Sequence, residues 1–187
     1  MKGRIEVICG SMFSGKTEEL QRRVKRARIA GQKVWVCKPD IDNRYSENQV
    51  VTHNGACIDS INIDTQNFKI PFRCGIKDES IYDIDVIAID EAQFFNDTII
   101  KEVKELANKM NKRVIIAGLD MDFEGNTFGS MGELMSIAND VQKVHAVCVK
   151  CGSDATFSHR IDDCNDKVEL GNTDKYEPLC RDCYNKL

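Results

Sequence analysis

The segment 10–17 carries the strongest chemical signal in the sequence. It reads Gly10-Ser11-Met12-Phe13-Ser14-Gly15-Lys16-Thr17 and fits the pattern G-x-x-x-x-G-K-[ST] at every fixed position. Consecutive backbone N–H groups in such a loop form a nest for phosphate oxygens. We expect Lys16 to reach the β- and γ-phosphates of ATP and the Thr17 hydroxyl to bind Mg²⁺. The alternative is a glycine-rich turn with an ordinary surface lysine.

Two adjacent carboxylates, Asp90 and Glu91, end the apolar run that begins at Ile84. An acid at the tip of a buried strand beside a phosphate loop holds Mg²⁺ directly or through water, which is the role we expect for Asp90. Glu91 is then free to accept a proton from a hydroxyl group or a water. The alternatives are a helix-capping aspartate and a solvated glutamate.

Nine cysteines are present, and four of them form two Cys-x-x-Cys pairs separated by 28 residues (152–179): Cys148, Cys151, Cys180 and Cys183. Two such pairs provide tetrahedral thiolate ligands for Zn²⁺, and a site filled by four protein ligands is structural. The alternative is four unrelated thiols. The remaining cysteines are interpreted as small thiols that bind no metal: Cys9, Cys37, Cys57, Cys74 and Cys164.

These residues require a scaffold that brings segments distant in sequence together. Apolar runs predict strands over 4–9, 33–37, 84–90, 114–118 and near 141–147, and helical spacing predicts helices over 16–30, 96–110 and 131–138. Residues 40–80 are expected to be irregular with short strands. Alternation of buried strands and helices indicates an α/β fold with a parallel sheet. Ligands bind at the carboxyl ends of such strands, so the loops after Cys9, Asp90 and Gly118 should line one site.

The chain is predicted to have two parts. Residues 1–146 form the phosphate-binding α/β domain, and residues 147–187 form a smaller zinc-binding domain in which the metal ties the base of a long loop. The smaller part has six basic and eight acidic residues, a net charge of −2. Because binding to nucleic acid by counterion release needs a cationic surface, we expect no nucleic-acid partner.

Composition excludes several other classes. The 187 residues include 26 Lys and Arg against 30 Asp and Glu, with 42% hydrophobic residues, which is ordinary globular composition. The sequence lacks an apolar stretch long enough for a transmembrane helix, and Glu6 interrupts a signal-like start. We therefore expect a cytoplasmic protein with no membrane partner and no disulfide framework.

Three weaker signals keep two interpretations each. A basic group on the first helix is interpreted as a solvated or interface-forming face: Arg22, Arg23, Lys25, Arg26 and Arg28. Arg44 either steadies a transferred phosphoryl group or is a surface residue in a turn. Apolar residues after two strands either stack on a base or pack in the core: Phe94, Phe95, Leu119, Phe123 and Phe128.

Taken together, the motifs resemble the thymidine kinases of the cellular, zinc-containing (type II) family. The matching features, in the family's order, are the phosphate loop 10–17, Asp42-Asn43-Arg44-Tyr45, Asp90-Glu91-Ala92-Gln93-Phe94-Phe95, Gly118-Leu119-Asp120, Phe123, Phe128-Gly129, the paired cysteines and Lys175-Tyr176. They extend over nearly the whole chain, which makes the combination far more specific than a phosphate loop alone.

The resemblance implies a P-loop, RecA-like domain and a zinc-tethered lasso that closes over thymidine. It implies transfer of a phosphoryl group from ATP to the 5′-hydroxyl, inhibition by dTTP and a homotetramer. By the resemblance, Glu91 is the general base, Lys16 and Arg160 assist catalysis, and Ala92 and Gln93 lie with Asp90 at the ATP site. The substrate-binding residues that it implies are Met12, Phe94, Leu119, Phe123, Ser158, Val168, Leu170 and Tyr176.

Three alternative functions differ in what they require of the chain. A P-loop kinase for another deoxynucleoside is the nearest alternative. An ATP-driven nucleic-acid motor needs a second ATPase domain and a basic track, which this chain does not supply. A non-enzymatic zinc-ribbon adaptor leaves the phosphate loop and the acidic pair unexplained.

Overall fold

Six parallel strands form the sheet that organises the molecule. In this computed structural model, residues 3–41, 49–51, 57–74, 79–161 and 175–187 are described. The strands are β1 (Arg4–Cys9), β2 (Val34–Pro39), β5 (Ile61–Ile63), β8 (Val86–Ile89), β9 (Arg113–Gly118) and β10 (Asp140–Lys143), in the order β10-β1-β9-β8-β2-β5. All of the neighbouring pairs in this sheet are parallel.

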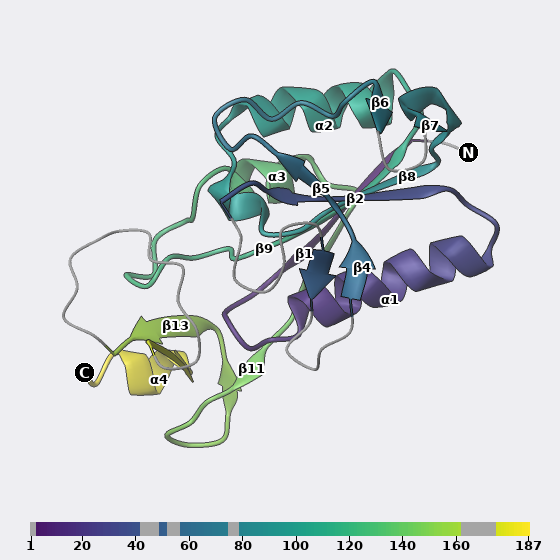
Figure 1. Cartoon of the computed structure of the whole chain (residues 1–187). Helices are drawn as coiled ribbons and strands as arrows, with labels where there is room; N and C mark the ends of the chain where they lie inside the picture. The colour runs from purple at the N-terminus through teal and green to yellow at the C-terminus, as the bar shows by residue number, and fades with distance from the viewer. Residues whose placement is uncertain (1–2, 42–48, 52–56, 75–78, 162–174) are drawn as a thin grey trace.

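Helices cover both faces of the sheet, as Figure 1 shows. Helix α1 (Lys16–Ile29) packs on one face, where Leu20 and Val24 meet Ile8 and Ile115. Helices α2 (Thr98–Asn108) and α3 (Met131–Ile137) contribute to the larger core on the opposite face. Because helices cover both faces, β8 is fully buried and β9 is buried beyond Arg113. This burial explains why both strands are almost continuously apolar. The predicted α/β class is confirmed.

Residues 40–80 contain short strands, as expected. Strand β3 (Gln49–Val51) pairs with β4 (Cys57–Asp59), and β6 (Arg73–Cys74) pairs with β7 (Glu79–Ser80). Strand β5 of the same region joins the main sheet beside β2. The short helices η1 (Ile81–Asp83) and η2 (Ala92–Phe94) precede and follow β8.

A second, smaller core surrounds the paired cysteines. Strand β11 (Ala146–Val147) pairs with β12 (Asp154–Ala155), β13 (Phe157–Arg160) pairs with β14 (Tyr176–Leu179), and helix α4 (Arg181–Tyr184) follows. Ala146, Phe157 and Leu179 belong to this core. The continuous strand predicted near 141–147 is instead two strands, β10 and β11. Val144 lies in the break between them, where its N–H donates to the Cys9 carbonyl at 2.8 Å.

The strand order places the predicted site. Strand β9 separates β1 from β8, so the loops that leave these three strands meet at one edge of the sheet. The loops after Cys9, Ile89 and Gly118 therefore lie together. The sequence predicts this grouping, with the second loop beginning after Asp90, one residue later than observed. Among the residues that the structure describes, the helices are too short or too polar to cross a membrane.

Candidate active site

The phosphate loop connects β1 to α1 through a series of unusual backbone conformations. Gly10 has φ +149°, and a Cβ atom there would lie 2.2 Å from the Val144 carbonyl oxygen, so only glycine fits. Phe13 and Gly15 adopt left-handed conformations with φ 62° and 82°. Such alternation turns successive N–H groups toward one point, and helix α1 begins at once with Lys16. The loop therefore has the backbone of an anion-binding nest.

Lys16 lies over its own loop. Its Nζ donates to the Ser11 carbonyl at 2.6 Å, and the Ser14 hydroxyl donates to the same oxygen at 2.7 Å. Burial lowers the pKa of Lys16, while the carboxylates of Glu91, Asp90 and Asp120 act in the opposite direction. The ammonium is thus held among acids at the mouth of the loop, where a bound phosphate would provide a stronger partner.

Asp90 and Thr17 bring β8 and α1 together. The Thr17 hydroxyl donates to Asp90 Oδ2 at 3.2 Å, and Asp90 is buried. Burial, with Glu91 as a second cause, raises the pKa of Asp90 to about 7. A divalent cation favours the ionised form of such a carboxyl group, and oxygen ligands suit Mg²⁺. The Thr17 and Asp90 oxygens therefore fit the magnesium role that the sequence predicts.

Glu91 follows with a left-handed backbone, φ 51°, which is uncommon outside glycine. Its N–H donates to Asp90 Oδ1 at 3.0 Å, and the turn leads into η2. Strained backbone of this kind is frequent at functional sites. The turn separates the two acidic side chains, since Asp90 faces Thr17 and Glu91 contacts Gln93.

Gln93 links Glu91 to the loop after β9. Its Nε2 donates to Glu91 Oε2 at 2.5 Å, and its Oε1 accepts from the Leu119 N–H at 3.0 Å. Gln93 and Ala92 are buried, whereas Glu91 and Leu119 are half-buried. Three of the predicted site residues therefore form one hydrogen-bonded chain across two strand ends.

The smaller unit contacts the phosphate loop directly. The Met12 N–H donates to the Ser158 hydroxyl at 2.9 Å, and the Ser11 hydroxyl donates to the Ala155 carbonyl at 3.2 Å. Phe13 also packs against the smaller core. Ser158 is buried on β13, and the pairing of β13 with β14 determines its position. The predicted residues Met12 and Ser158 are thus in contact.

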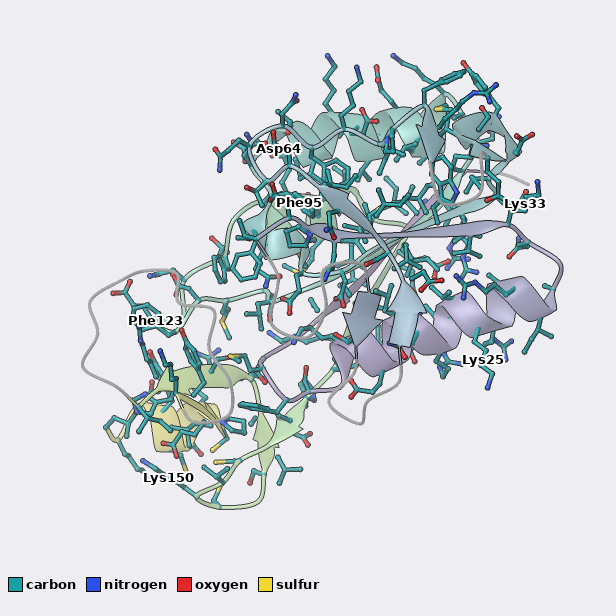
Figure 2. All side chains as sticks on the ribbon, viewed as in Figure 1. Lys25, Lys33, Asp64, Phe95, Phe123 and Lys150 are labelled. Carbon is teal, nitrogen blue, oxygen red and sulfur yellow. The ribbon has the colours of Figure 1, made fainter. Side chains whose placement is uncertain are left out.

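Arg160 brings two of the predicted base-binding aromatic residues together. Its guanidinium lies 5.3 Å from the centre of the Phe123 ring and 6.0 Å from that of Tyr176, its partner in the β13–β14 register. The Tyr184 hydroxyl donates to the Phe123 carbonyl at 2.7 Å, which fixes the loop on the smaller unit. Figure 2 shows Phe123 over this unit.

The remaining predicted residues have separate outcomes. Phe94 forms an edge-to-face pair with Phe128 at 5.8 Å. Phe95 packs against Phe68 at 4.6 Å in the core, so stacking on a base is excluded for it. Val168 and Leu170 lie outside the described residues, as do the segment 42–45 and Cys164.

The four paired cysteines converge. The sulfur atoms of Cys148, Cys151, Cys180 and Cys183 all lie within 4.8 Å of one another. Tetrahedral zinc with bonds of about 2.3 Å places its sulfur ligands roughly 3.8 Å apart, so the cluster fits a zinc ion. Backbone N–H groups, first that of Cys180, lower the pKa of Cys148 to about 6, which favours the thiolate that binds metal.

Two residues have structural roles that the sequence analysis did not predict: Asp120, which it names only within the match Gly118-Leu119-Asp120, and Arg23. Asp120 is buried beside the site, and its Oδ2 lies 2.6 Å from Lys143 Nζ. Its place after a buried strand was the available signal. Arg23 is also buried, where it pairs with Glu6 at 2.7 Å, so the solvated interpretation of the basic helix face is wrong for this residue. Its partner is 17 positions away, and no local pattern reveals it.

A phosphate nest, an acidic strand end and a neighbouring cysteine-held unit define a P-loop protein that acts on nucleoside triphosphates. The sequence model of the family described as thymidine kinase matches residues 3–184, and the chain belongs to this family. This match confirms the family and the enzyme class, an ATP-dependent thymidine kinase, that the sequence predicts.

Individual relatives agree with the family match. The chain is 56% identical over 183 residues to a thymidine kinase of Bacteroides thetaiotaomicron, with 98% of this chain and 87% of the relative covered. It is 55% identical to that of Bacteroides fragilis over 99% of this chain and 88% of the relative. It is 48% identical to that of Porphyromonas gingivalis over 99% of this chain and 86% of the relative.

Proposed function

We propose that the protein transfers the γ-phosphoryl group of ATP to the 5′-hydroxyl of thymidine, which gives dTMP for DNA precursor salvage. The observation that carries the proposal is the contact of the acidic end of β8 with the phosphate loop, 3.2 Å between Thr17 Oγ1 and Asp90 Oδ2. This contact supports a position of the adjacent Glu91 beside the phosphates that Lys16 would hold. The arrangement suits in-line transfer to a hydroxyl group.

Each residue at the strand ends has a distinct role. The amides of 10–17 and Lys16 bind the triphosphate, and Thr17 and Asp90 would hold Mg²⁺, which would supply positive charge to neutralise the phosphates. Glu91 accepts the proton of the 5′-hydroxyl as it attacks. Arg160 holds the base-binding aromatic residues in place.

Thymine is a neutral base, so shape and hydrogen bonds must select it. The apolar walls come from Met12, Phe94, Leu119, Phe123 and Tyr176. We assign contacts with the base edge to Ser158, Val168 and Leu170. A buried polar edge discriminates strongly, because a wrong base leaves hydrogen-bonding groups unpaired.

The proposal extends to the whole protein. Residues 1–146 form the ATP-binding part, and residues 147–187 form the lasso part with a structural zinc ion on the four cysteines. We propose a cytoplasmic homotetramer with dTTP as feedback inhibitor, without nucleic-acid or membrane partners. Mass measurement in solution and dTTP titration test these two properties.

A Glu91→Gln variant tests the catalytic assignment. We expect kcat with thymidine to fall by about 10²- to 10⁴-fold, the usual contribution of a general base, while ATP–Mg²⁺ affinity and zinc content stay unchanged. Near-normal turnover in a folded, zinc-loaded variant would refute the role of Glu91. A panel of thymidine, deoxyuridine, deoxycytidine and deoxyguanosine tests the substrate, and preference for another nucleoside would overturn thymidine.

A further inference from the structure

The orientation of the Gln93 side-chain amide is determined by its surroundings. The Leu119 backbone N–H is a donor only, so the group that faces it at 3.0 Å must be the amide oxygen. The amide nitrogen therefore points the other way, toward Glu91 Oε2 at 2.5 Å. Because an NH₂ group only donates, this carboxylate oxygen is held as an acceptor. The hydrogen bond from Gln93 thus fixes the position of Glu91 Oε2. Because the carboxylate group is planar and rigid, the position of Oε1 is restricted as well.

The packing around Gln93 leaves its side chain little freedom to move. Gln93 is 3% exposed. A Cβ atom on Gly118 would lie 2.9 Å from Gln93 Oε1, and one on Gly129 would lie 2.3 Å from the Gln93 carbonyl oxygen. The end of β9 therefore lies against the side-chain amide of Gln93, and the Gly129 backbone lies against its main chain. A buried residue held at both its side chain and its backbone transmits the position of its surroundings to its hydrogen-bond partners.

The local backbone does not fix the position of the Glu91 carboxylate, so a neighbouring side chain is needed to hold it. The glutamate backbone at φ 51° lies in a sparsely populated region, and its half-exposed side chain is long and flexible. Gln93 follows two positions later on η2, where its side chain reaches back to the carboxylate. The amide oxygen of Gln93 accepts from Leu119, the first residue after β9, which is one of the two central strands of the sheet.

We propose that Gln93 is a positioning residue that holds the Glu91 carboxylate against the loop after β9, rather than a ligand of ATP. This inference rests on the proposed function, because it gives Gln93 the task of aligning the general base. It replaces the sequence-based assignment of Gln93 to the nucleotide site. Its consequence is selective: the alignment of the base is lost without Gln93, and nucleotide binding is kept.

The test compares Gln93→Leu and Gln93→Met with the unchanged enzyme. We expect kcat to fall about ten- to hundredfold, the effect of one hydrogen bond to a charged group, and the Kd of ATP–Mg²⁺ by calorimetry to change less than twofold. A Ser130→Ala variant is the control. Its buried hydroxyl also bonds to this region, through the Phe95 carbonyl at 3.4 Å, without contacting Glu91. Unchanged kcat, or a tenfold weaker ATP affinity, would overturn the proposal.

A double-variant cycle separates positioning from a merely structural role. In a Glu91→Gln background, Gln93→Leu should reduce the residual rate less than twofold, because the group that it positions is already absent. An equal loss in both backgrounds would contradict the inference. The proposed general-base role of Glu91 fails separately, if Glu91→Gln itself retains its turnover.

Discussion

Glu6 is a buried carboxylate on β1 that pairs with two arginine side chains. Its carboxylate receives Arg113 Nε at 2.8 Å and Arg23 at 2.7 Å, and its side chain is 5% exposed. Burial opposes ionisation, but the hydrogen bonds and charges of Arg113 and Arg23 outweigh it and lower the pKa of Glu6. Removing such a carboxylate leaves two guanidinium groups without their shared partner.

We predict that Glu6→Gln lowers the free energy of unfolding at pH 7 by about 3 kcal/mol, the usual cost of breaking a buried ion pair. A carboxyl group whose pKa is lower in the folded than in the unfolded protein stabilises the fold at pH values above the unfolded pKa. This stabilisation is lost as the pH falls through the folded pKa. The unchanged protein should therefore lose stability below about pH 4.5 more steeply than the variant does. Urea unfolding from pH 3 to 7 measures both effects.

The control is Glu105→Gln, which removes a surface pair with Lys109 at 2.8 Å and should leave the free energy of unfolding almost unchanged, because exposed ion pairs contribute little. Equal losses for the two variants would contradict the importance given to Glu6.

Strand β13 is one of the elements that connect the smaller unit to the phosphate loop. Ser158 accepts the Met12 N–H, so the phosphate loop is supported from outside by a strand of the smaller unit. A P-loop amide held in this way is pre-ordered before the nucleotide arrives. Pre-ordering contributes to affinity because it reduces the entropy lost on binding.

We predict that Ser158→Ala weakens ATP–Mg²⁺ binding about fivefold, the equivalent of one neutral hydrogen bond. Ser158→Thr keeps the hydroxyl group and should stay within twofold. Calorimetric titration with ATP before thymidine is added distinguishes this effect from any change in base binding. Identical affinities for the alanine and threonine variants would show that the loop does not depend on β13.

At the scale of the whole molecule, the two cores should respond differently to loss of zinc. The core around Phe157 and Leu179 includes Cys148 and Cys180, so the sulfur cluster is part of its packing. The large sheet has separate cores on its two faces. Trp35, the single tryptophan, is buried on β2 and reports on the sheet.

We predict that a strong chelator unfolds the smaller unit and weakens ATP binding, while Trp35 fluorescence and most of the far-ultraviolet circular dichroism remain. Re-addition of zinc should restore the affinity for ATP. A change of Trp35 emission in parallel with zinc loss would instead show that the two units unfold together.

The sequence predicted those parts of the molecule whose residues are close together in the chain. The phosphate loop, β1 and the buried run before Asp90 are each continuous in sequence, and the paired cysteines have a defined spacing. It failed where partners are distant: β5 joins the sheet beside β2, and Glu6 pairs with Arg113, 107 positions away. The hydrogen bond from Gln93 to Glu91 depends on a left-handed backbone at Glu91, which no residue pattern in the sequence predicts.

The central place of β9 has a consequence for altering the enzyme. The loop that leaves it contacts two other parts of the sheet's carboxyl edge: Leu119 is bonded to Gln93, and Asp120 is paired with Lys143 on the strand beside β1. We therefore expect substitutions there to weaken the binding of ATP and of thymidine together. Strands β13 and β14 carry Ser158, Arg160 and Tyr176 on a separate hairpin. Laboratory evolution toward nucleoside analogues should therefore randomise the hairpin and keep the central loop constant.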